Sequence, residues 1–193
     1  KRNLLGCLEI AIFMRQGASR FSGKKDEMLR SFSVLLFSMP ITYLAIYYMQ
    51  PAKPAFQHLS TSLVMTMFTV RFLLVTALFF LLVYGVLKQY KRTEHFFQFI
   101  SASNWIGLIS TFLFLPILWG LITGSYGWEE MSPYVIALSI YTYVYTAFMA
   151  TFVLRLPWEM AGFIVICGLA LNQTSLDFLL WLGEKLSTAT VTL

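Results

Sequence analysis

Two charged side chains lie inside long apolar stretches of the chain, and they are the first candidates for chemistry. Arg71 interrupts the apolar run 63–87, and Asp177 interrupts a second run, 160–181. Runs of this length cross a bilayer as helices. A charge inside a membrane costs about 2.5–3.5 kcal/mol on insertion scales, so each charge is expected to have a partner. We therefore predict an ion pair between Arg71 and Asp177.

The depths of the two charges support this pairing. Counted from the charged residues that end the two runs, Arg71 and Asp177 lie 17 and 18 residues along their helices. At 1.5 Å per residue both reach about 25–27 Å from the same membrane boundary, near its far edge. Two alternatives stay open. Each charge extends to the nearer headgroups, or Arg71 pairs with one of the loop acids Glu129 and Glu130.

A second group of polar side chains lies nearer the middle of three predicted spans. Because lipid offers no hydrogen-bond partners, these side chains are expected to face one another or a cavity. One interpretation is hydrogen bonding between helices, and the other is a site for a substrate or an ion. The group consists of Ser101, Ser103, Asn104, Tyr141, Thr142, Tyr145, Thr146 and Asn172.

No motif of enzyme chemistry accompanies these residues. The sequence has no nucleophile elbow, no glycine-rich phosphate loop and no H-E-x-x-H pattern, and His58 is too isolated for a metal site. Cys7 and Cys167 lie in apolar surroundings and are interpreted as small apolar side chains. We expect no enzyme activity, no cofactor and no metal.

Five apolar stretches place these residues in a membrane. The chain is 58% hydrophobic and only 12% charged, against about 25% charged residues in soluble domains, so we predict an all-α polytopic membrane protein. Pro40 predicts a kink in the first span, and Pro133 is expected in the first turn of the fourth. The predicted spans are 28–48, 63–87, 96–122, 133–154 and 160–181.

A shorter apolar segment, 3–16, precedes the spans. Its ten apolar positions cannot cross a bilayer, so we predict a short amphipathic helix in the membrane interface, with docking on a partner as the alternative. The face expected to be apolar carries Leu4, Leu5, Leu8, Ala11 and Ile12. Basic residues near this segment and after the second span are expected to contact anionic headgroups: Arg15, Arg20, Lys24, Lys25, Lys88, Lys91 and Arg92.

The distribution of positive charge orients the spans. Eleven Lys and Arg residues fall on one side of the five spans, and only Lys53 and Lys185 fall on the other. By the positive-inside rule the N-terminus is cytoplasmic and the C-terminus lies on the opposite side. The net charge of +5 follows topology and forms no single patch, so nucleic acid is not an expected partner. We expect a bacterial inner membrane, with an organelle membrane as the alternative.

The chain thus divides into an interfacial helix with a basic loop (1–27), a five-helix bundle (28–182) and a short polar tail (183–193). Its third span follows a basic turn and opens with a polar and aromatic run, KRTEHFFQFISASNWIGLISTFLFLP, and its last two spans are closely paired in YTYVYTAFMATFVLRLPWEMAGFIVI. Over 28–181 this layout resembles the Yip1-domain family of small membrane proteins. The resemblance implies a scaffold or trafficking-type adaptor without catalytic residues. The N-terminal helix and Arg71 depart from the family pattern.

These features favour a non-catalytic structural or accessory subunit, or a scaffold, in a larger membrane assembly. Its expected partners are membrane lipids and other integral membrane subunits. The alternative is a small transporter or channel component with a polar site between the third, fourth and fifth spans. A water-filled cavity bordered by Asn104 and Asn172 would favour this alternative.

Overall fold

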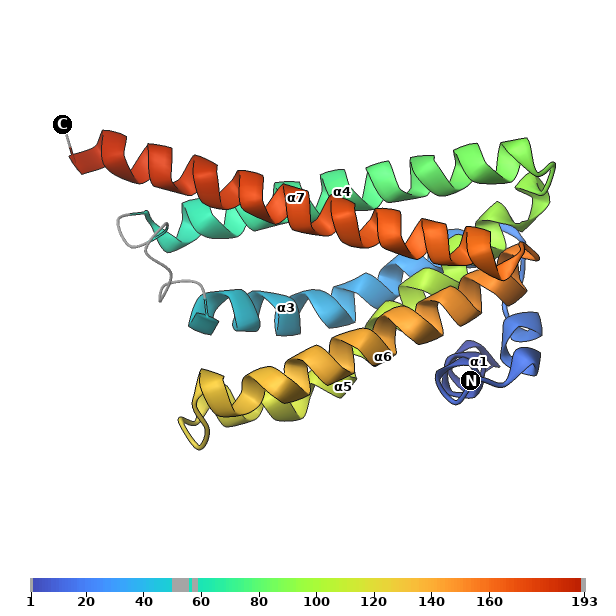
Figure 1. Ribbon diagram of the computed structural model, residues 1–193, viewed down its shortest axis with the longest axis horizontal. Coiled ribbons are helices and arrows are strands. Elements are labelled where there is room, and N and C mark those ends of the chain that lie inside the picture. The colour runs from blue at the N-terminus through green and yellow to red at the C-terminus, as the bar shows by residue number, and fades with distance from the viewer. Residues whose placement is uncertain (1, 50–55, 57–58, 192–193) are drawn as a thin grey trace.

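The computed structural model describes residues 2–49, 56 and 59–191, and the regular elements in these residues are all helical. Five helical segments are long and apolar enough to cross a membrane, so the chain is an all-α polytopic membrane protein, as predicted. The five segments run alongside one another in Figure 1. They are Lys25–Tyr47, Thr61–Gln89, Thr93–Ile122, Glu129–Leu154 and Trp158–Leu186.

Short helices precede and interrupt these segments. In chain order the elements are α1 (Arg2–Ala11), the 3-10 helix η1 (Arg15–Arg20), α2 (Lys25–Ser31), η2 (Phe32–Val34), α3 (Leu35–Met49), α4 (Thr61–Gln89), η4 (Thr93–His95), α5 (Phe96–Ile122), α6 (Trp128–Leu154) and α7 (Trp158–Val191).

Helices α4 and α5 match the predicted spans closely. The hydroxyl of Ser60 accepts a hydrogen bond from the backbone N–H of Leu63, which caps α4 two residues before the predicted start. Helix α5 begins and ends at the predicted residues. Long apolar runs with polar ends therefore locate these two helices from sequence alone.

The other spans differ from prediction at their ends. The 3-10 turn η2 divides the first span, and α3 continues as α-helix through Pro40. Helix α6 begins five residues before Pro133, because the Glu130 carboxylate accepts a hydrogen bond from the N–H of Gly127 and starts the helix early. Helix α7 runs on through the predicted tail to Val191, since no proline or further glycine follows Gly183. Lys53 and His58 lie outside the described residues.

Each helix packs against specific neighbours. Helix α5 packs on α6 and α3, and α7 packs on both α4 and α6. The end that carries α1, η1 and the turns between α4 and α5 and between α6 and α7 is here named the basic end (Figure 1). Its large buried cluster includes Leu87, Phe99, Tyr145, Met149 and Ile164. The cluster toward the opposite end is smaller and consists of Ile46, Phe56, Val64, Phe68 and Leu179.

Candidate functional site: a cavity at mid-span

Four polar or charged residues lie near the middle of four different spans. Arg71, Asn104, Thr142 and Asn172 are each within four residues, or about 6 Å, of the midpoint of their own span. All four line one cavity of about 440 Å³ between α3, α4, α5, α6 and α7. Pockets of about 300–1,000 Å³ are typical of small-molecule sites.

Two glycines shape this cavity in different ways. A Cβ atom on Gly107 of α5 would meet nothing within 4 Å, so this glycine leaves open space beside the polar residues. A Cβ atom on Gly168 of α7 would come within 2.9 Å of the Phe79 ring, so that glycine lets α4 and α7 pack closely. The Phe79 ring therefore fills the space between these two helices at the wall of the cavity, whereas the cavity is open at Gly107.

Arg71 of α4 is bound to α7. Its Nε donates to Ser175 Oγ at 3.0 Å, and its Nη2 donates to the backbone oxygen of Asn172 at 2.8 Å and to the side-chain Oδ1 of Asn172 at 2.6 Å. The predicted contact between these two spans is present, but its partner differs from the prediction. Among the described residues no ion pair joins Arg71 to Asp177, Glu129 or Glu130.

The register of the two helices explains this difference. Asn172 lies at the midpoint of the α7 span and Asp177 lies five residues nearer the opposite end, where its carboxylate accepts a hydrogen bond from Gln173 at 3.1 Å. The guanidinium of Arg71 thus bonds to α7 at the midpoint of that span, and its predicted depth near the membrane edge stays a prediction. Neutral oxygen atoms, not a carboxylate, hold this charge.

The charge of Arg71 remains uncompensated inside the cavity. The described residues that line the cavity include no Asp or Glu. A guanidinium has five N–H donors, and the three hydrogen bonds to α7 use Nε and Nη2. Within the described part of the chain, Nη1 donates to nothing. The site therefore presents a positive charge and free donors at a depth where water is scarce.

The remaining walls of the cavity have two characters. Phe72, Val75, Phe79 and Phe80 of α4 form an apolar wall, and Thr76 adds one hydroxyl to it. Helices α3 and α7 add the apolar side chains of Leu35, Val165 and Leu169. The hydroxyl and amide side chains of α5 and α6 line the rest of the cavity: Ser103, Asn104, Ser110, Thr142, Tyr143 and Thr146. A ligand in this cavity would contact mainly apolar side chains, with polar groups from α5 and α6 on one side.

The predicted polar layer therefore divides into two parts. Asn104, Thr142 and Asn172 line the cavity, while Ser101, Tyr141 and Tyr145 serve packing elsewhere. The Tyr145 hydroxyl bonds the hydroxyl of Ser110 between α6 and α5. Asn104 also donates to Ser31 of α2 at 2.9 Å, and Tyr141 donates to the backbone oxygen of Ala11 at 2.5 Å. The buried hydroxyls of Ser101 and Ser103 have no partner among the described residues.

The N-terminal segment is docked on the bundle of its own chain. The sequence analysis considered docking only on a partner, as the alternative to a helix in the membrane interface. Helix α1 appears end-on beside the long helices in Figure 1, so it lies across them. Phe13 contacts the rings of Tyr141 and Phe148 of α6. The docked face of α1 is buried and consists of Gly6, Cys7, Glu9 and Ile10.

An ion pair that sequence reasoning missed holds this segment together. The Arg20 guanidinium donates from both Nε and Nη2 to the Glu9 carboxylate, each at 2.5 Å. These hydrogen bonds from Arg20 hold the pKa of the Glu9 carboxyl below its usual range. Arg20, predicted to contact lipid headgroups, is the partner of a buried acid. The available signal was a lone glutamate in the apolar run LLGCLEIAIF.

Close backbone contact makes this ion pair possible. A Cβ atom on Gly17 would lie 2.6 Å from the backbone oxygen of Gly6 and 3.0 Å from Cβ of Glu9. A Cβ on Gly6 would in turn lie 3.0 Å from the backbone oxygen of Gly17 and from Cβ of Arg20. Glycine is required at both positions for α1 and η1 to approach this closely.

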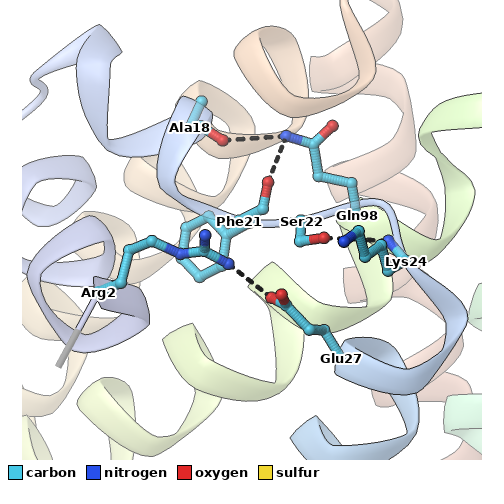
Figure 2. A network of polar contacts seen from close by, with 7 residues as sticks. All are labelled: Arg2, Ala18, Phe21, Ser22, Lys24, Glu27 and Gln98. Atoms are coloured by element: carbon cyan, nitrogen blue, oxygen red, sulfur yellow. Dashed lines mark hydrogen bonds and ion pairs between the residues drawn. The ribbon is translucent and has the colours of Figure 1, made fainter.

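Polar contacts also fix the segment to α5 and α2, as Figure 2 shows. The amide of Gln98 donates to the backbone oxygens of Ala18 at 3.0 Å and Phe21 at 3.1 Å. Arg2 pairs with Glu27 of α2 at 2.7 Å. The segment is thus tied to the bundle on two sides.

The opposite face of α1 is exposed and apolar. It includes Leu4, Leu5 and Leu8, and Ile12 just beyond the helix is 63% exposed. The side chains of this predicted apolar face therefore point away from the bundle. Of the cations predicted to contact headgroups, six are exposed: Arg15, Lys24, Lys25, Lys88, Lys91 and Arg92. Arg15 also lies 5.1 Å from the centroid of the Phe152 ring.

These features define a polytopic helical membrane protein with a charged intramembrane cavity. In comparisons with known proteins, the chain matches no family model, no curated protein and no solved structure. The resemblance to the Yip1-domain family therefore stays a prediction.

Proposed function

We propose that this chain is a small-molecule carrier or channel component that holds its ligand in the mid-span cavity. The single observation that carries this proposal is the cavity of about 440 Å³ lined by Asn104, Thr142, Asn172 and Arg71. Three spans contribute polar side chains that the sequence analysis assigned to a possible transport site, and α4 adds the charge of Arg71. An intramembrane charge without an acidic partner indicates a functional site, because packing alone gives no reason to retain its cost.

This function needs no enzyme chemistry. The cavity brings together one guanidinium with hydroxyl and amide groups, and the described residues that line it include no paired acid and base. The proposal therefore includes the absence of catalysis and of a cofactor. A carrier has to bind and release its ligand, and neutral hydrogen-bonding groups around one charge are suited to reversible binding.

The proposed setting is a bacterial inner membrane, with the basic end cytoplasmic. The exposed lysines and arginines at the basic end support this orientation by the positive-inside rule. The first prediction, an accessory subunit or scaffold with other membrane subunits as partners, stays a prediction. Exposed apolar side chains on the spans do not favour it, since contact with lipid requires the same surface.

Cysteine labelling tests whether the cavity is open and hydrated. In a Cys167→Ser background, Gly107→Cys places a thiol in the cavity, and Leu78→Cys is the matched control at similar depth on the exposed side of α4. In proteoliposomes, N-ethylmaleimide should label the cysteine at 107 much faster than that at 78, because thiolate forms only where water is present. Native Cys7 is buried and should not contribute. Equal, slow labelling at both positions would contradict the proposal.

A further inference from the structure

We propose that the ligand of this cavity is a single-chain carboxylate, the anion of a fatty acid, which enters sideways from the bilayer. This inference rests on the proposed function and adds the ligand class and the route of entry. It follows from three independent properties of the site: its charge, its two walls and its opening.

The charge of the site matches one negative charge. Arg71 is the one charged residue among the described residues that line the cavity. A monoanion would leave the occupied cavity neutral, whereas a phosphate dianion would leave one negative charge uncompensated at mid-depth. The two free N–H groups of Nη1 can donate to carboxylate oxygens, which accept charge-assisted hydrogen bonds.

The walls of the site match an amphiphile. The aromatic and aliphatic side chains of α4 that follow Arg71 run toward the basic end, from Phe72 through Val75 to Phe79 and Phe80. A hydrocarbon chain can lie along this wall while its carboxylate stays at Arg71. A small hydrophilic anion would leave the same wall without a contact.

The site has a lateral opening. Toward the basic end the four helices α4–α7 enclose a buried cluster that includes Val83, Ala102, Met149 and Ile164. Toward the opposite end, Phe68 and Leu179 are buried where α4 meets α7. By contrast, the cavity-lining residues Phe72 and Leu169 are 38% and 40% exposed. This exposed surface belongs to the cavity and its mouth, and because the cavity lies at mid-span, a ligand dissolved in the bilayer can reach it.

Protection of the cysteine at 107 tests this inference in the same proteoliposomes. Palmitate should slow labelling by N-ethylmaleimide several-fold, whereas hexadecanol, which has the same chain without the charge, should leave the rate unchanged. In the Cys167→Ser/Gly107→Cys protein, Arg71→Gln should abolish protection by palmitate. Lys88→Gln, which removes an exposed cation from the same helix, should preserve it.

The other outcomes overturn the inference in distinct ways. Equal protection by hexadecanol would show that the charge has no role. Protection by butyrate but not by palmitate would indicate a soluble anion, and stronger protection by hexadecyl phosphate would indicate a phosphate-bearing lipid. In these cases the proposed function stands. If the cysteine at 107 does not react even without ligand, the proposed function itself fails. The comparison of palmitate with hexadecanol keeps Arg71 intact, so it remains decisive if Arg71→Gln does not fold.

Discussion

Two arginines of this protein are each held by another helix, and they differ in what holds them. Arg20 donates two hydrogen bonds to the carboxylate of Glu9, so the pair is neutral. Arg71 donates three hydrogen bonds to the neutral groups of Asn172 and Ser175, and its positive charge remains. Charge compensation suits a permanent structural contact, whereas an uncompensated charge beside a cavity suits a ligand that comes and goes.

The packing around the two arginines also differs: it is close around Arg20 and open beside Arg71. Glu9 is buried on the docked face of α1, and the cluster beneath it contains Cys7, Ile10 and Phe21. Arg71 lines a cavity next to Gly107, which has open space beside it. The space around the Glu9–Arg20 pair is filled by side chains of the protein, whereas the space beside Arg71 is free for a ligand.

Breaking the Glu9–Arg20 pair should have the largest effect on stability. Glu9→Leu leaves the guanidinium of Arg20 partly buried without its acid, which is strongly destabilising, while Glu9→Leu/Arg20→Leu removes both charges and should recover much of the loss. Thermal unfolding in detergent, followed by tryptophan fluorescence, measures both. Glu27→Leu is the control, because the Arg2–Glu27 pair is exposed and should contribute little. A double variant no better than Glu9→Leu would contradict this account.

Gly17→Ala should release the docked segment with the next largest effect. The added Cβ would meet the backbone oxygen of Gly6 at 2.6 Å, and backbone cannot move aside as a flexible side chain can. Burial raises the pKa of the Cys7 thiol to about 12, so Cys7 should react slowly with N-ethylmaleimide in the native protein and faster once the segment is released. Gly85→Ala, where a Cβ meets nothing within 4 Å, should leave the rate unchanged.

Acid pH should weaken the Glu9–Arg20 contact and leave the contacts of Arg71 unchanged. The folded protein lowers the pKa of Glu9, so this contribution to stability is complete above the unfolded value of about 4.3 and is lost as the pH falls through the lower folded pKa. The midpoint of thermal unfolding should therefore fall at acid pH in the native protein and fall less in Glu9→Gln. Arg71→Met should follow the native pH profile, since Arg71 has no carboxylate partner among the described residues. Identical profiles for the native protein and Glu9→Gln would refute this.

Arg71→Met should change stability least. The substitution leaves Asn172 and Ser175 without one partner but removes a charge that costs about 2.5–3.5 kcal/mol on insertion scales, and these effects oppose each other. The unfolding temperature should stay within a few degrees of the native value. A loss as large as that of Glu9→Leu would identify Arg71 as a structural residue and remove the distinction between the two sites.

The spans of this protein can be located from its sequence, because length and hydropathy are local properties. The bounds of α4 and α5 follow from apolar runs that end in polar residues. The candidate residues of the site were also visible, since Arg71, Asn104 and Asn172 are polar positions in apolar helices.

How these residues combine depends on the packing of the helices against one another. The axial offset of α4 against α7 gives Arg71 the neutral Asn172 and leaves Asp177 to Gln173. Residue counting measured depth along each helix but not this offset. The Glu9–Arg20 pair likewise depends on the close approach of Gly6 and Gly17, a contact between backbones that no side-chain pattern records. The physical reason is the same in both cases: local sequence fixes the helices, and the packing between them fixes which charges meet.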